Sequence, residues 1–171
     1  DLLWTGLTQN DGPFAVRYPR GSVPEGFDET RVPRVLPVGS WEVLHEGSDV
    51  GLLAVGTMVG VAGETRERLE RRGISTMVVN CRFVKPLDVG ILRRARETCS
   101  ALMTIEENNL PGGFGDAVLE QLDESGLSVR NVIRAGLPDR FVGHGTRDEL
   151  LSEVGLTAEQ LESRIRESLA G

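Results

Sequence analysis

Apolar runs alternate with amphipathic segments from residue 41 to the end of the chain. The run from Val50 to Val55 is almost continuously apolar, which is typical of a strand buried on both faces of a parallel sheet. Residues 41–45 are predicted to form an edge strand. Buried strands are predicted at residues 50–55, 75–81 and 101–105, and a further strand is predicted at residues 127–133.

Helical segments lie between these runs and after the last of them. Asp88 is the expected N-cap of one helix, and Gly73 and Gly126 are expected to end two others. Near the C-terminus, two Thr-x-x-Glu/Gln patterns predict capping boxes at Thr146 and Thr157. The segments predicted as helices are residues 56–72, 87–98 and 115–125, followed by two capped helices that include a stripe of Leu161, Ile165 and Leu169.

This alternation predicts the fold class. Strands that alternate with helices of these lengths form an α/β domain with three layers, in which a mostly parallel sheet carries helices on both faces.

The first forty residues have a different character. Leu2, Leu3 and Leu7 suggest the last turns of a helix that begins outside the chain, and residues 14–18 suggest a short strand. Residues 21–37 are rich in glycine and proline and are predicted to be a linker. With no initiating methionine, the chain is expected to be a piece of a longer polypeptide.

Charge and cysteine content exclude several classes of function. The net charge of −7 and the pI near 4.9 argue against nonspecific binding to nucleic acid. Two cysteines, Cys81 and Cys99, are too few for a disulfide framework and favour a cytoplasmic location. No apolar stretch approaches about 18 residues, so no membrane span is expected.

Two arginines in the sequence Arg-Tyr-Pro-Arg-Gly form the most informative candidate site. Pro19 stiffens the backbone and Gly21 allows a turn, so Arg17 and Arg20 can project from the end of an extended segment. Guanidinium groups bind phosphate bidentately, which makes this a candidate anion site. On spacing alone, an exposed segment with solvated or locally paired arginines remains the simpler alternative.

A glycine-rich turn and two adjacent glutamates are weaker candidates. Residues 112–115 (Gly-Gly-Phe-Gly) precede a helix but lack the dinucleotide fingerprint, so a tight strand-to-helix turn is the favoured interpretation. Glu106 and Glu107 would point to opposite faces of a strand, which argues against a paired acid and base. One of them is expected to cap the next loop or to pair with an arginine.

The sequence predicts neither a metal site nor a catalytic residue in this chain. His45 and His144 are about a hundred residues apart, and zinc needs three or four closely spaced ligands. His144 lies in a glycine-flanked loop, where it could titrate near neutrality or reach a partner subunit, but a surface or hydrogen-bonded histidine is the simpler interpretation. Both cysteines are expected to be buried and inert. Arg93, Arg94 and Arg96 are expected to be a solvated helix face.

Four sequence segments together resemble the 1-deoxy-D-xylulose-5-phosphate synthase family, whose members are thiamine-diphosphate enzymes. The resemblance covers essentially the whole chain, and RYPRG separates this family from transketolases and from the beta subunits of 2-oxoacid dehydrogenases. The matching segments are DGPFAVRYPRG at 11–21, RFVKPLD at 82–88, EEN at 106–108 with GGFG at 112–115, and GLPD at 136–139 with HG at 144–145.

The resemblance implies a division into the end of a pyrimidine-binding domain (residues 1–21), a linker (22–36) and a transketolase-type C-terminal domain (37–171). It also implies a cytoplasmic homodimeric transferase that serves isoprenoid and thiamine synthesis and joins pyruvate to glyceraldehyde 3-phosphate with release of CO2. Thiamine diphosphate and Mg²⁺ would be bound by the other domains, because the motifs that hold them do not occur here. Arg20, with Arg17 as a companion, would bind the phosphate of the aldehyde. The fragment alone would be inactive, and a purely assembly-related role remains an alternative.

Overall fold

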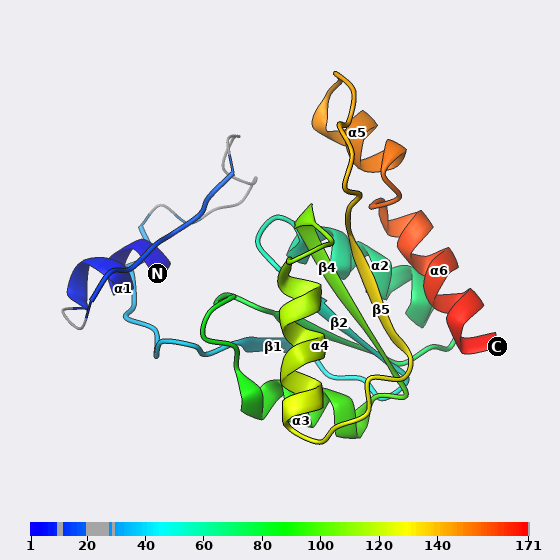
Figure 1. The fold of residues 1–171 in the computed structure, drawn as a ribbon, viewed down its shortest axis with the longest axis horizontal. Helices are drawn as coiled ribbons and strands as arrows, with labels where there is room; N and C mark the ends of the chain where they lie inside the picture. The colour runs from blue at the N-terminus through cyan, green and yellow to red at the C-terminus, as the bar shows by residue number, and fades with distance from the viewer. Residues whose placement is uncertain (10–11, 20–27, 29, 171) are drawn as a thin grey trace.

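The computed structural model describes residues 1–9, 12–19, 28 and 30–170 (Figure 1). It contains a five-stranded sheet with the order β1-β3-β2-β4-β5. Strands β3, β2, β4 and β5 are parallel, and β1 pairs antiparallel with β3 at one edge. The strands are β1 (Glu42–His45), β2 (Val50–Ala54), β3 (Thr76–Asn80), β4 (Ala101–Asn109) and β5 (Val132–Leu137).

Helices cover both faces of this sheet, so the predicted three-layer α/β fold is confirmed (Figure 1). On one face, side chains of α2, α5 and α6 pack on the sheet, and on the other face those of α3 and α4 do so. The helices are α1 (Leu2–Thr8), α2 (Met58–Glu70), α3 (Val89–Thr98), α4 (Phe114–Glu124), α5 (Arg147–Glu153) and α6 (Ala158–Ala170). Within the described residues, none of these helices is both long and apolar enough to cross a membrane.

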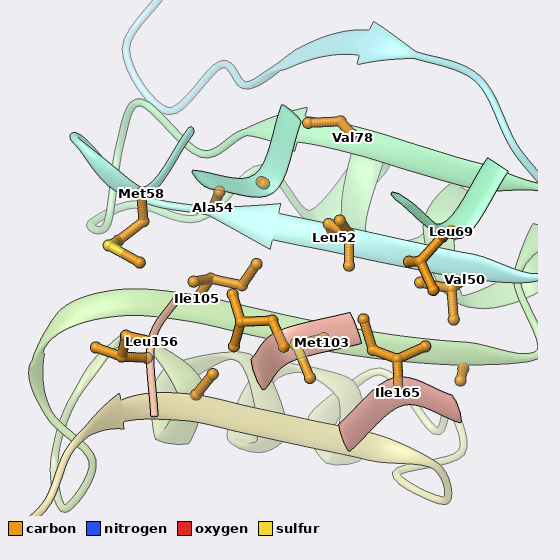
Figure 2. Close-up of a cluster of buried hydrophobic side chains, with 14 of the residues drawn as sticks. Val50, Leu52, Ala54, Met58, Leu69, Val78, Met103, Ile105, Leu156 and Ile165 are labelled. Carbon is orange, nitrogen blue, oxygen red and sulfur yellow. The ribbon is translucent and has the colours of Figure 1, made fainter. Parts of the chain in front are cut away.

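Alternate residues of the central strands form two separate cores. Figure 2 shows the core beneath α2 and α6, where Leu52 and Met103 from neighbouring strands meet Leu69 and Ile165 from the helices. Leu53 and Leu102 point to the other core, beneath α3 and α4. Because both faces of the middle strands are buried, their sequences are largely apolar, and the run of β2 is the clearest case.

The helix signals in the sequence are confirmed at the level of hydrogen bonds. The Asp88 carboxylate accepts from Ile91 N at 2.9 Å and caps α3. Thr146 and Glu149 form the predicted capping box of α5. Thr157 makes the same reciprocal contacts with Gln160 at the start of α6.

Three local predictions are wrong. The strand predicted at residues 127–133 begins only at Val132, because Leu127 N bonds back to Leu122 O and closes the end of α4. Residues 14–18 are extended but form no strand, since no described backbone segment pairs with them. In α6 the stripe ends early, because Leu169 is 39% exposed whereas Leu161 and Ile165 are fully buried.

Helix α1 lies apart from the sheet, and the residues around it attach to one another (Figure 1). Thr5 Oγ1 accepts from Leu36 N at 2.9 Å, and the Asp1 carboxylate accepts from Arg34 N at 2.9 Å. The following segment contacts the α/β body through the ring of Phe14, which meets the ring of Phe83 edge-on at 6.2 Å between centroids.

Candidate functional site

The carboxyl ends of β2 and β4 form the position at which sheets of this kind bind ligands. These two strands are neighbours, but β3 follows β2 on one side and β5 follows β4 on the other, so the chain reverses its direction of winding between them. Such a reversal opens a crevice beyond the strand ends. Thr57 follows β2, and Glu107 and Asn108 lie near the end of β4.

Glu107 is the centre of a network of polar contacts at this edge. Its carboxylate accepts from Thr57 Oγ1 at 2.6 Å, and from Arg147 Nε at 3.2 Å and Nη2 at 2.9 Å. Burial acts to raise the pKa of Glu107, but the hydrogen bonds from Arg147 and Thr57 outweigh it and lower the pKa below the usual range. Glu107 is therefore an anion held by Arg147, which confirms that one of the adjacent glutamates pairs with an arginine.

Arg17 reaches the same edge from the N-terminal segment. Its Nη1 donates to Asn108 Oδ1 at 3.3 Å, and its charge contributes to the lowered pKa of Glu107. Arg20 lies outside the described residues, so the structure tests neither its position nor the phosphate role predicted for the two arginines.

Glu106 faces the opposite way and caps α4. Its carboxylate, only 2% exposed, accepts from Phe114 N and from Gly115 N, each at 2.8 Å. A Cβ on Gly113 would lie 2.6 Å and 2.8 Å from the two carboxylate oxygens, so glycine is needed there for close approach. The carboxylate occupies the position that a bound phosphate would take, which supports the tight turn predicted for residues 112–115.

An apolar cavity lies beside the Glu107 network. Its volume is about 340 Å³, and Glu107 and Arg147 form the polar part of its lining. The other lining residues come from the end of β5 and from the region of α5, and they are Leu137, Val142, Leu150, Leu151 and Val154. A lining of this kind suits an apolar side chain or an aliphatic group better than a charged substrate.

The remaining candidates behave as surface or structural groups. The part of the chain that the structure describes has no cluster of three or more His, Cys, Asp or Glu side chains that could hold a metal. His144 is exposed. Arg94 pairs with Glu46 at 2.7 Å, and Arg96 donates to the carbonyl oxygens of Cys99 and Ser100 at the end of α3.

Sequence reasoning missed Thr57, Asn108 and Arg147. A usable signal was present for the first two, because each lies where a buried parallel strand ends and such ends meet at one edge. Arg147 carried no such signal, since its contact with Glu107 spans forty residues.

Comparison with known proteins places the chain in a family. Residues 39–161 match the model of the transketolase C-terminal domain. The chain is 44% identical over 168 residues to 1-deoxy-D-xylulose-5-phosphate synthase of Geobacillus thermodenitrificans, a match that covers 96% of this chain and 26% of that protein. It is 46% identical over 169 residues to the same-named protein of Thermomicrobium roseum, covering 99% of this chain and 27% of that protein.

Solved structures agree with these matches. A split-gene transketolase in an inactive beta4 tetramer is 34% identical, with a TM-score of 0.76, and the match covers 88% of this chain and 48% of that one. Transketolase of Pichia stipitis, at 17% identity and a TM-score of 0.52 over 77% of this chain and 18% of that one, shares the fold.

This chain spans about a quarter of the length of the curated relatives it matches. The boundaries at residues 21 and 36 are not tested by these matches and remain predictions. The chain belongs to the transketolase C-terminal domain family, and the resemblance of its sequence to 1-deoxy-D-xylulose-5-phosphate synthases is confirmed.

Proposed function

We propose that this chain is the C-terminal part of a 1-deoxy-D-xylulose-5-phosphate synthase. The whole enzyme condenses pyruvate with glyceraldehyde 3-phosphate and releases CO2. The observation that supports this most strongly is the similarity to the synthases over 96–99% of the chain, which includes the RYPRG segment. We propose further that the enzyme is a cytoplasmic homodimer, in which this domain contacts the remaining domains of the same polypeptide.

The cofactors are assigned to those other domains. Thiamine diphosphate with Mg²⁺ supplies the chemistry that decarboxylates pyruvate. This assignment is supported by the described residues, which contain no group of three or more His, Cys, Asp or Glu side chains that could hold a metal ion, and by Glu106, which caps α4. The contribution of this chain is to bind and orient the acceptor aldehyde.

Within this chain, the phosphate of glyceraldehyde 3-phosphate is assigned to Arg20, with Arg17, three residues earlier, as its companion. A guanidinium that holds the phosphate can fix the aldehyde carbon close to the reacting carbon of the donor. Positioning of this kind contributes several kcal/mol of barrier lowering in favourable cases.

The test uses the full-length enzyme with pyruvate and glyceraldehyde 3-phosphate. We expect formation of 1-deoxy-D-xylulose 5-phosphate and CO2 in equal amounts. Arg20→Ala is expected to raise the KM for the phosphorylated aldehyde about tenfold to a hundredfold, because a charge-assisted contact is lost, and to leave the KM for pyruvate nearly unchanged. Arg20→Lys is expected to reverse only part of this rise in KM, since lysine keeps the charge without the bidentate geometry.

Unphosphorylated glyceraldehyde is the control substrate, and the reaction with it is expected to be nearly unaffected by Arg20→Ala. An equal loss with both aldehydes would contradict the phosphate role. Transfer from a ketose donor, or acyl transfer to a lipoyl group, would instead identify a transketolase or a 2-oxoacid dehydrogenase.

A second function applies to the chain by itself, as an assembly module without activity. This is favoured by the similarity to a split-gene transketolase chain solved as an inactive tetramer. Calorimetry of the isolated chain with thiamine diphosphate and Mg²⁺ is expected to show no binding at micromolar concentrations. Tight binding would contradict the assignment of the cofactor to other domains.

A further inference from the structure

We propose that Arg17 anchors the arginine-bearing segment to the sheet through Asn108, which makes Asn108 a positioning residue for phosphate binding. This inference rests on the proposed function, and it separates the roles of the two arginines. Arg17 attaches the segment to the C-terminal domain, and Arg20 is left to contact the phosphate.

Two contacts, three residues apart, fix the segment to the edge of the sheet. The ring of Phe14 meets the ring of Phe83 at 6.2 Å, and Arg17 Nη1 donates to Asn108 Oδ1 at 3.3 Å. Phe83 follows β3 and Asn108 lies in β4, and these two strands flank β2. Two inter-strand spacings amount to about 9.6 Å, and three extended residues span about 10 Å. The segment therefore has the length needed to bridge the ends of β3 and β4.

Asn108 is well placed to hold a partner because its own backbone is tightly packed. A Cβ on Gly136 of β5 would lie 3.0 Å from the Asn108 carbonyl oxygen, so the two strands approach closely there. The register between β4 and β5 shifts between Ile105 and Asn109. Such irregularities redirect side chains at strand ends, next to functional sites.

The charges near Arg17 suit an anchor better than a phosphate ligand. The carboxylate of Glu107 is close enough for the charge of Arg17 to influence it. An anion bound at Arg17 would be repelled by this carboxylate, whereas the guanidinium itself is attracted to it. In addition, Nη1 of Arg17 already donates one hydrogen bond to the amide oxygen of Asn108.

The first test measures kinetics of the full-length enzyme with Asn108→Ala. We expect the KM for glyceraldehyde 3-phosphate to rise about three- to tenfold, the effect of losing one ordinary hydrogen bond, because this contact is exposed to solvent. The kcat and the KM for pyruvate are expected to stay unchanged. The matched control is Asn109→Ala, one residue further along β4, whose side chain is exposed. Asn108→Asp keeps an acceptor oxygen for Arg17 and is expected to restore the KM.

A double-mutant cycle tests whether Arg17 is an anchor of the segment or a ligand of the phosphate. If Arg17 acts only through Asn108, the variant carrying both Arg17→Ala and Asn108→Ala is no worse than Arg17→Ala alone. Two outcomes would overturn the proposal and make Arg17 an independent phosphate ligand. In the first, the two substitutions raise the KM by factors that multiply in the double variant. In the second, the KM of Asn108→Asp is as high as that of Asn108→Ala.

The second test needs no activity and uses the chain itself. Trypsin must take the Arg17 side chain into its own pocket to cut after it, so an anchored Arg17 is protected. Asn108→Ala is expected to speed cleavage after Arg17 several-fold. The control variant Asn109→Ala is expected to leave this rate unchanged. Cleavage after Arg34 serves as the internal reference. Equal rates of cleavage after Arg17 in the two variants would contradict the anchoring role of Arg17, even if the full-length enzyme proves to be a synthase. Faster cleavage in Asn108→Ala would support the anchor even if the assay showed a different reaction.

Discussion

Glu106 and Glu107 are adjacent, yet their carboxylates perform different tasks because a strand directs them to opposite faces. Glu106 satisfies two backbone N–H groups at the buried start of α4, and Glu107 is held by Arg147 and Thr57 at the edge of the sheet. Each carboxylate thus already accepts hydrogen bonds from groups of the chain itself.

The cap formed by Glu106 can be tested by Glu106→Gln. The substitution places an NH2 group where an oxygen now accepts from a buried N–H, which leaves a donor unpaired. We expect the free energy of unfolding to fall by about 1–3 kcal/mol, measured by urea denaturation. Glu120→Gln, at an exposed position of the same helix, is the control and is expected to change it by less than about 0.5 kcal/mol. Equal stability of the two variants would contradict the cap.

The two thiols are expected to be unreactive in the folded chain. Burial raises the pKa of Cys99 to about 11, and it raises the pKa of Cys81 well above the usual range for a thiol. At pH 8 only about one Cys99 side chain in a thousand is then a thiolate. Ellman's reagent should therefore titrate both thiols only after denaturation, and a rapid reaction of either thiol without denaturant would contradict this.

At the scale of elements, α6 is held against α2 by an ion pair that reaches into the core layer. The carboxylate of Glu162 is 4% exposed and accepts from Arg68 Nε at 2.7 Å and also from Arg72. Burial acts to raise the pKa of Glu162, but these two arginines outweigh it and lower the pKa. Because the folded pKa lies below the unfolded value of about 4.3, this carboxylate stabilises the fold above that pH and loses its effect as the pH falls through the folded pKa.

Glu162→Gln is therefore expected to destabilise the chain in a pH-dependent way. At pH 7 the free energy of unfolding should fall by about 1–3 kcal/mol, less than for a fully buried pair because both arginines are partly exposed. The difference from the original chain should shrink as the pH falls below about 4. Glu159→Gln is the matched control, since Glu159 lies 3.9 Å from the same Arg68 but is 81% exposed. A difference that is constant with pH would contradict the ion pair as its cause.

The elements that were predicted correctly are those whose signals are local. The capping residues Asp88 and Thr146, and the apolar run of β2, depend on a few neighbouring residues. The start of β5 was missed because Leu127 looks like a strand residue but closes the preceding helix, a choice made by the backbone geometry at Gly126.

The candidate site was only partly predictable for the same reason. From the residues alone, Arg17 could be singled out as a candidate, and Glu106 and Glu107 could be assigned to opposite faces of a strand, with one of them capping a loop or pairing with an arginine. Their partners Asn108 and Arg147 depend on contacts across ninety-one and forty residues, respectively. The end of a buried strand marks Asn108 as a candidate, but no local pattern shows which residues pair, because the pairs form only when the strand ends are brought to one edge.

At the scale of the whole molecule, the described N-terminal residues leave large apolar side chains uncovered. On α1, Leu3 is 62% and Leu7 is 78% exposed, and Trp4 between them is 47% exposed. Contiguous apolar side chains of this size on a helix generally pack against another surface.

The isolated chain is accordingly expected to self-associate as its concentration rises. Sedimentation measurements should show a smaller average mass for the variant carrying both Leu3→Glu and Leu7→Glu. Val129→Glu is the control, because Val129 is exposed singly on the α/β body. A chain that stays monomeric at every concentration, or an equal effect of the control, would contradict a role for α1.

The cap formed by Glu106 has a consequence for how this domain depends on its surroundings. In sheets of this type, a phosphate group of a bound metabolite commonly neutralises the positive end of a central helix. Here the counter-charge is encoded in the polypeptide and is present from the moment the strand and helix come together. The rigidity of this edge is therefore independent of metabolite supply, which suits a part that must keep its neighbours aligned while substrates arrive and products leave.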